Sequence, residues 1–365
     1  MADGRLHIGV DGRELIGEPT GVGRYLERVL VRWMQTPDWP HRVTVFLHGD
    51  PPPHLAGLAG LEWHIDHTPR AGTLWEQVRL PSAIASRSVD VFFAVGYTAP
   101  LRMHCPFVVI VHDVSFVTHP EWFSWREGLR RRWLTRWTAQ RAATVLTVSE
   151  FSAGEVSRAF GISPRVMRLA PPPAREPVSP WTKSPERLVL YVGSMFNRRH
   201  VPDLIDAFAK VRERVPDARL VLVGANRSAP HVDPVALAAS HHLQHAVEWR
   251  EYVDDTALDH LYRRARVFAF LSEYEGFAMT PMEALAYGVP SVLLDTPVSR
   301  EIYGDAAVRV PLDQTAIVDA IIRLMDDDAS RTAALEAGRE RLRRFSGERT
   351  ATEIRRALEA AVSPS

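Results

Sequence analysis

Two glutamates, Glu275 and Glu283, stand eight residues apart in the chain. A carboxylate is repelled by phosphate, but it accepts hydrogen bonds readily from neutral donors. The vicinal hydroxyls of a sugar or a ribose are natural donors of this kind. The pair therefore indicates a site that binds sugar hydroxyls.

The residues around the two glutamates predict a strand, a loop and a helix. Residues 265–271 form a short apolar run that is typical of a buried parallel strand. Thr280 is expected to cap the following helix, Pro281 to occupy its first position and Gly288 to end it. The free N–H groups at such a helix N-terminus attract phosphate. A phosphate site beside a hydroxyl site indicates a nucleotide sugar.

Two adjacent arginines, Arg198 and Arg199, follow a predicted strand at 187–193 and precede a predicted helix. Paired guanidinium groups in this position can bind a diphosphate, although a solvated pair is an equally good interpretation of these residues alone. The chain has only two lysines, Lys183 in a proline-rich segment and Lys210 on the polar face of a predicted helix. A pyridoxal-phosphate enzyme needs a buried Schiff-base lysine, so the sequence disfavours that class.

Further candidates lie in the N-terminal half of the chain. Gly21 and Gly23 come just before a predicted helix, and glycines there let the backbone approach phosphate, although glycine turns before helices are common. The predicted strand 107–111 ends in His112, at the edge where open parallel sheets bind ligands. A histidine in this position is as often structural as catalytic.

These motifs together resemble a known family. The stretch E-G-F-A-M-T-P-M-E-A-L-A-Y-G-V-P contains both glutamates and resembles the E-x7-E signature of retaining glycosyltransferases of family 4. Y-V-G-S-M-F-N-R-R-H resembles the basic segment with which that family grips the donor diphosphate, and G-V-G-R-Y resembles its glycine loop. The chain departs from the family pattern at Ala278, where glycine is usual, and at His200, where asparagine is usual.

The resemblance implies an α/β protein with the GT-B fold, in which two Rossmann-like domains with parallel sheets face each other across a cleft. It implies transfer of a hexose, with retention and without a metal or cofactor, from a nucleoside diphosphate sugar to a hydroxyl of a glycan or glycolipid. Catalytic roles would fall to His112, Arg198, Arg199 and Glu275, with Glu275 holding the donor sugar. The donor would also contact Gly21, Gly23, Val253, Gly276, Phe277, Ala278, Met279, Thr280 and Glu283. Among these, Glu283 would hold the ribose and the Val253 backbone the base.

The donor itself is less clearly indicated. Segments starting at Asp11 and at His112 resemble bacterial mannosyltransferases of surface polysaccharide synthesis, so we expect GDP-mannose. One alternative is a nucleotide-sugar epimerase or hydrolase of the same fold. Another is an inactive scaffold that binds a nucleotide.

The 365 residues fit two domains of nearly equal size, and predicted strands and helices alternate along both halves. Residues 170–185 hold six prolines and predict a stiff linker. We therefore predict an acceptor-side domain (1–170), a linker (171–186), a domain that binds the nucleotide sugar (187–345) and a last helix that returns to the first domain (346–365).

Residues 121–143 predict an amphipathic helix. A stripe of apolar residues recurs every four positions, with six arginines on its flanks. The stripe consists of Trp125, Leu129, Trp133 and Trp137. The helix either packs on its own sheet or docks on anionic lipid through 121–141. Because tryptophans also fill ordinary cores, we favour the first interpretation.

The composition excludes several classes. The net charge is zero, which argues against a general nucleic-acid binder. No apolar run approaches the roughly 20 residues that span a bilayer, and the first residues do not resemble a signal peptide, so we expect a cytoplasmic protein. Cys105 is the single cysteine, which excludes disulfides and cysteine metal clusters. Asp326–Asp328 end a predicted helix, where we expect a solvated cluster rather than a metal site.

Overall fold

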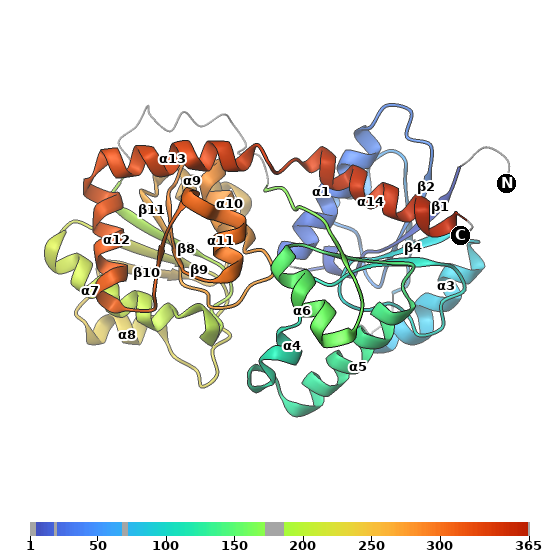
Figure 1. The fold of residues 1–365 in the computed structure, drawn as a ribbon, viewed down its shortest axis with the longest axis horizontal. Helices are drawn as coiled ribbons and strands as arrows, with labels where there is room; N and C mark the ends of the chain where they lie inside the picture. Colours follow the sequence, from blue (N-terminus) through green and yellow to red (C-terminus); the bar gives the residue numbers. More distant parts are fainter. Residues whose placement is uncertain (1–4, 18–19, 68–71, 172–185, 364–365) are drawn as a thin grey trace. The chain divides into compact units, whose positions relative to one another are not determined.

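The computed structural model describes residues 5–17, 20–67, 72–171 and 186–363. The chain forms two compact units, each built on its own parallel sheet (Figure 1). Unit 1 comprises residues 1–170 and 346–365, and unit 2 comprises residues 171–345. The predicted linker 171–186 falls almost wholly on residues 172–185, which lie outside the described residues.

Unit 1 contains a seven-stranded sheet in the order β3-β2-β1-β4-β5-β6-β7, with every neighbouring pair parallel. The strands are β1 (His7–Asp11), β2 (Arg42–Leu47), β3 (Leu61–Ile65), β4 (Val91–Ala94), β5 (Phe107–Ile110), β6 (Thr144–Thr147) and β7 (Arg165–Val166). The helices are α1 (Gly21–Gln35), α2 (Pro53–Ala56), α3 (Leu80–Ser86), α4 (Ser115–Thr118), α5 (Trp125–Arg141), α6 (Glu150–Phe160) and α14 (Gly347–Val362).

Unit 2 contains a six-stranded parallel sheet in the order β10-β9-β8-β11-β12-β13. The strands are β8 (Leu188–Val192), β9 (Arg219–Val223), β10 (Val247–Arg250), β11 (Val267–Phe270), β12 (Ser291–Leu294) and β13 (Ala307–Val310). The helices are α7 (Val201–Arg214), α8 (Pro234–Ser240), α9 (Asp255–Arg264), α10 (Met279–Ala286), α11 (Pro297–Tyr303), α12 (Gln314–Asp326) and α13 (Asp328–Leu342). The strand order reverses between β8 and β11, and open sheets bind ligands at such a reversal.

The strands near the middle of each sheet are buried on both faces. Every residue of β4 and β11 is buried, and such continuous apolar runs are what made these strands predictable. Two strands of unit 1 lack that signal, because β3 is only half-buried along its length and β7 has two residues. The sequence does not predict them. The α/β prediction is confirmed.

The last helix, α14, packs within unit 1. The indole N–H of Trp33 on α1 donates to the Ala351 carbonyl over 3.0 Å. The Thr350 hydroxyl donates to the Arg168 carbonyl over 2.6 Å. Ile354 and Leu358 are fully buried, so the C-terminal helix supplies part of the core of unit 1.

Candidate active site

The strand, loop and helix predicted around the two glutamates are present as β11, residues 271–278 and α10. The helix begins at Met279, and Ala278 holds the N-cap position without a side-chain hydrogen bond. The prediction that Thr280 caps the helix and Pro281 starts it is therefore wrong. Ala278 has φ 62° and ψ 73°, a left-handed conformation that favours glycine. This turn starts the helix earlier than the Thr-Pro signal suggested.

Arg199 and Glu275 bind each other directly. Arg199 Nε donates to Glu275 Oε1 over 2.7 Å, and the Ser272 hydroxyl donates to the same oxygen over 2.9 Å. The two side chains are only 15% and 14% exposed. Among the described residues no partner is recorded for Glu275 Oε2. The carboxylate is thus fixed through one oxygen and keeps the other as a hydrogen-bond acceptor.

Aromatic rings and a backbone carbonyl hold the rest of the Arg199 guanidinium. Its Nη1 donates to the Ser194 carbonyl over 2.9 Å, and its central carbon, Cζ, lies 5.0 Å from the centre of the Phe270 ring. Burial by itself would lower the pKa of Arg199, but the charge of Glu275, the influence of Tyr191 and the hydrogen bonds to both together outweigh burial and raise the pKa above its ordinary value. Burial raises the pKa of the neighbouring Tyr191 to about 12. Arg199 is therefore a permanent cation and Tyr191 a neutral phenol.

Arg198 and Arg199 lie in a short 3₁₀ turn, Asn197–Arg199, between β8 and α7. The Arg198 guanidinium lies 4.5 Å from the centre of the Phe196 ring, and the Arg198 carbonyl accepts from the Glu273 N–H over 3.0 Å. Asn197 anchors the front of the turn through both side-chain atoms: Nδ2 donates to the Ala229 carbonyl over 2.6 Å, and Oδ1 accepts from the Ala229 N–H over 2.9 Å. The turn is thus tied to the loops after β9 and β11.

Glu283 lies on α10 and is only 5% exposed. The Tyr262 hydroxyl donates to Glu283 Oε2 over 3.2 Å. This phenol is a neutral donor of the kind expected beside the carboxylate, but it comes from the protein itself. The contact of Glu283 with a ribose stays a prediction.

Tyr303, at the end of α11, contacts the loop that lies between the two glutamates in the chain. Its hydroxyl donates to the Ala278 carbonyl. Burial raises the pKa of Tyr303 well above its ordinary value, and the charges of Glu275 and Glu283 raise it further. Sequence reasoning misses Tyr303 because it lies far from both glutamates in the chain. Ser272 could have been found, since it is a polar residue directly after a buried strand.

The remaining predicted donor-binding residues of unit 2 occupy different environments. Phe277 is 5% exposed and meets the Phe345 ring edge-on at 5.5 Å, so its side chain packs in the core. Gly276 is buried and Met279 is half-buried, both beside the first turn of α10. Val253 is half-buried in the turn after β10.

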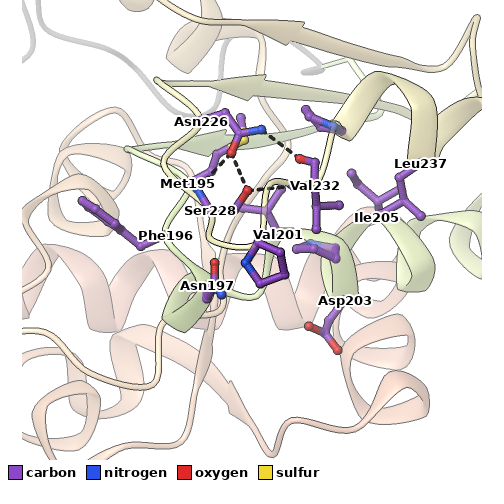
Figure 2. A pocket seen from close by; sticks show the side chains of 13 residues that line it. Met195, Phe196, Asn197, Val201, Asp203, Ile205, Asn226, Ser228, Val232 and Leu237 are labelled. Atoms are coloured by element: carbon purple, nitrogen blue, oxygen red, sulfur yellow. Dashed lines mark hydrogen bonds between the residues drawn. The ribbon is translucent and has the colours of Figure 1, made fainter. Parts of the chain in front are cut away.

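A cavity of about 220 Å³ lies beside the start of the 3₁₀ turn Asn197–Arg199. It is lined by α7, α8, residues 195–197 and the loop 226–232 (Figure 2). Its polar lining groups bind one another: Asn226 Nδ2 donates to the Val232 carbonyl over 2.8 Å, and the Ser228 hydroxyl donates to Asn226 Oδ1 over 2.8 Å. These bonds tie the loop to itself. None of the predicted donor-binding residues lines this cavity.

His112 lies in unit 1, directly after β5. Its Nε2 is 3.0 Å from the Val95 carbonyl, which can only accept, so Nε2 carries the proton and Nδ1 presents a lone pair. Burial lowers the pKa of His112, while the Val95 carbonyl, Asp113 and Glu14 oppose the shift. The neighbouring Asp113 accepts from the Tyr97 hydroxyl over 2.8 Å. His112 is therefore set up as a neutral hydrogen-bond acceptor.

The two glycines predicted to contact phosphate lie in the first turn of α1 rather than before it. The Gly23 N–H donates to the Thr20 hydroxyl, which caps the helix, over 3.0 Å. A Cβ at Gly23 would lie 2.1 Å from the Glu14 carbonyl oxygen, so a close backbone approach requires glycine there. Gly21 is exposed with open space around it. Contact of either glycine with phosphate stays a prediction.

No group of three or more His, Cys, Asp or Glu side chains in the described ranges is arranged to hold a metal ion. No described helix has the length and apolar character that crossing a bilayer requires.

Comparison with known proteins places this geometry in a family. Residues 19–174 match the family described as Glycosyltransferase Family 4, and residues 176–341 match Glycosyl transferases group 1. The O-antigen chain mannosyltransferase B of Escherichia coli is 30% identical over 67% of this chain and 68% of its own length. The GDP-mannose:cellobiosyl-diphosphopolyprenol alpha-mannosyltransferase of Xanthomonas campestris is 23% identical over 78% of this chain and 72% of its own length.

A solved structure extends the comparison to the whole fold. HepE of Anabaena, in complex with UDP-glucose, superposes with a TM-score of 0.75 at 18% identity over 97% of this chain and 99% of its own. The chain belongs to family 4 of the glycosyltransferases and has the GT-B fold.

Proposed function

We propose that this protein transfers a hexose from a nucleoside diphosphate sugar to a hydroxyl of a glycan or glycolipid, with retention of configuration and without a metal. The observation that carries the proposal is the 2.7 Å bond between Arg199 and Glu275. It brings an anion-binding cation and a hydroxyl-binding carboxylate together beside the N-terminus of α10. In a nucleotide sugar the diphosphate and the sugar hydroxyls lie close together, so one ligand could contact both side chains.

The donor would contact a carboxylate oxygen, a guanidinium group and a helix N-terminus of unit 2. Glu275 Oε2 can accept from a hydroxyl of the sugar, as the fixed oxygen Oε1 already accepts from Arg199 and Ser272. The Arg198 guanidinium and the first turn of α10 would attract the diphosphate. As the sugar–phosphate bond breaks, negative charge grows on the leaving oxygen. Preorganised guanidinium groups stabilise that charge without a metal.

The state of Glu275 bears on the route by which retention would be achieved. Its charge is shared with Arg199 and a serine hydroxyl, which makes it a poor nucleophile toward the sugar carbon. We propose a displacement on one face instead. The acceptor oxygen bonds to the anomeric carbon on the side from which the diphosphate leaves, and the acceptor proton moves to a phosphate oxygen. His112 would position a hydroxyl through its Nδ1 lone pair.

GDP-mannose is the donor that we propose. The names of the two mannosyltransferase relatives support mannose, and one of them names GDP-mannose. The UDP-glucose complex of the Anabaena structure supports a uridine nucleotide as the runner-up. We also propose that the protein works in the cytoplasm, at the inner face of a membrane, in peripheral contact through residues 121–141.

A thermal-unfolding panel tests the donor. GDP, UDP, ADP and dTDP, each with and without a sugar, are added to the full chain. A ligand at 100 times its dissociation constant adds about 2.7 kcal/mol to the free energy of unfolding. The proposal predicts that GDP-mannose gives the largest shift. Donor consumption without an acceptor would favour the epimerase or hydrolase, and tight binding without turnover on any acceptor would favour the scaffold.

A further inference from the structure

Five large apolar side chains of unit 1 point into solvent from two segments. On α5 they are Trp125 (73% exposed), Leu129 (59%) and Trp133 (55%), which lie four residues apart and share one helix face. On the turn before α3 they are Leu74 (49%) and Val78 (56%). The interpretation that the α5 stripe packs on the sheet is therefore wrong for these three residues.

The two segments are neighbours. Arg130 on α5 donates through Nη1 to the Thr73 hydroxyl, next to Leu74. Single exposed apolar residues are ordinary, but a contiguous group of large ones marks a binding surface. We call Leu74, Val78, Trp125, Leu129 and Trp133 the apolar surface.

The other side of α5 explains why these residues face outward. The buried residues of α5 are Gly128, Leu134, Thr135, Thr138 and Ala139. The Thr138 hydroxyl accepts from the Ala99 N–H over 3.2 Å, in the loop after β4. These residues form the inward face of α5. The tryptophans are thus placed away from the core by the packing of the opposite face.

The charged side chains of α5 are mostly arginines. Arg126, Arg132 and Arg136 are exposed on α5, and Arg126 lies 5.3 Å from the centre of the Trp125 ring. The one carboxylate of the helix, Glu127, is paired with Arg131 at 2.8 Å. Tryptophan and arginine around aliphatic side chains suit a bilayer surface, where the rings enter the headgroup region and the guanidinium groups meet lipid phosphates.

We propose that the apolar surface inserts into the headgroup region of an anionic membrane, with Leu74 and Val78 as a second point of insertion beside α5. This deepens the proposed function, on which it rests, by naming the surface that would bring the enzyme to a membrane-borne acceptor. A second copy of the chain is a poorer occupant, because a twofold interface would oppose the same arginines. Binding of a nucleic acid would not explain why leucine and valine are exposed on this surface.

Vesicle flotation of the full chain tests the proposal. Wild type should bind phosphatidylcholine vesicles that contain phosphatidylglycerol, should not bind phosphatidylcholine alone, and should dissociate as salt rises. The triple variant Trp125→Ser, Leu129→Ser, Trp133→Ser and the double variant Leu74→Ser, Val78→Ser should each bind at least tenfold more weakly. The matched control is Val235→Ser, Leu312→Ser, which changes side chains that are 52% and 47% exposed in unit 2. The control should bind as wild type does.

A charge variant separates the contribution of the arginines to vesicle binding from that of the apolar side chains. Each arginine near an anionic surface strengthens binding by roughly fivefold, so Arg126→Gln, Arg132→Gln, Arg136→Gln should weaken it by roughly 100-fold. No binding of wild type at low salt would overturn the proposal, as would unchanged binding by the Leu74, Val78 variant. Self-association or nucleic-acid binding that the triple variant abolishes would assign the surface to those partners instead.

The shift in thermal unfolding with GDP distinguishes failure of the membrane proposal from failure of the proposed function. Variants that lose vesicle binding but keep the nucleotide shift would support both. If wild type binds anionic vesicles but no nucleotide shifts its unfolding, the proposed function fails and the docking surface stands.

Discussion

Arg199 Nε and Glu275 Oε1 lie 2.7 Å apart, so the residues expected at the diphosphate and at the sugar form one ion pair. Each therefore fixes the orientation of the other. A donor bound beside the pair would meet a cation and a carboxylate whose positions are already set. Preorganisation of this kind lowers the cost of stabilising charge during the reaction.

Arg199→Ala should damage folding as well as turnover. It leaves the mostly buried Glu275 carboxylate with a hydrogen bond from Ser272 but without its cation. Breaking a buried ion pair typically lowers the free energy of unfolding by about 3 kcal/mol. Turnover should fall by at least about 100-fold. Unfolding of Arg199→Ala, Glu275→Gln and the double variant gives a coupling energy, which should be roughly 1 to 3 kcal/mol.

The exposed pair Arg264 and Glu186, with bonds of 2.7 and 2.9 Å, is the matched control. Its coupling should stay below about 1 kcal/mol because both partners are largely solvated. Equal coupling in the two pairs would mean that Arg199 and Glu275 do not constrain each other.

Ala278→Gly should stabilise the protein. Ala278 holds φ 62°, and a left-handed conformation costs a residue with a Cβ roughly 1 kcal/mol more than glycine. The midpoint of thermal unfolding should rise by about 2 °C. The control Ala286→Gly, in the last turn of α10, should lower stability by about 1 kcal/mol. A fall in both variants would show that the Ala278 backbone is unstrained.

Asn197→Ala should slow turnover without unfolding the protein. Both bonds of Asn197 go to Ala229 and fix the front of the turn that carries Arg198. Loss of positioning should cost about tenfold in kcat, while the donor KM changes little. The control Asn226→Ala breaks bonds inside the loop 226–232 but none to the turn. If both variants slow turnover equally, the loop and not the Asn197 contact is responsible.

His112 should make stability depend on pH. Burial lowers its pKa from the ordinary 6.5, so the unfolded chain takes up a proton at a higher pH than the folded protein does. Stability present above about pH 6.5 is therefore lost as the pH falls. His112→Gln, whose amide can still donate to Val95, should lose less stability between neutral and mildly acidic pH. An unchanged pH dependence in this variant would place the titration elsewhere, for example at His7 or His64, whose pKa values burial also lowers.

The sequence predicts those parts of the site that local patterns encode. Glu275, Arg198 and Arg199 were predictable because each follows a continuous apolar strand. Tyr303 was not, because it reaches the loop only through the packing of α11. The start of α10 was missed because the left-handed turn at Ala278 overrides the capping signal of the next residues.

The orientation of α5 was mispredicted for a different reason. Periodicity puts Trp125, Leu129 and Trp133 on one face, but it does not say which face is buried. The buried face carries Gly128 and Thr138, small residues that give no hydrophobic signal.

The central claim is that unit 2 binds a nucleotide sugar, with Glu283 on the ribose and Glu275 on the sugar. Calorimetry with GDP and GDP-mannose on wild type, Glu283→Gln and Glu275→Gln tests it most directly. Glu283→Gln should weaken both ligands by roughly 1.5 to 3 kcal/mol, because the ribose loses a charged acceptor. Glu275→Gln should weaken GDP-mannose clearly more than GDP, because only GDP-mannose loses the acceptor of its sugar hydroxyl. Equal losses for both ligands in Glu275→Gln, or no binding of any nucleotide by wild type, would contradict the account.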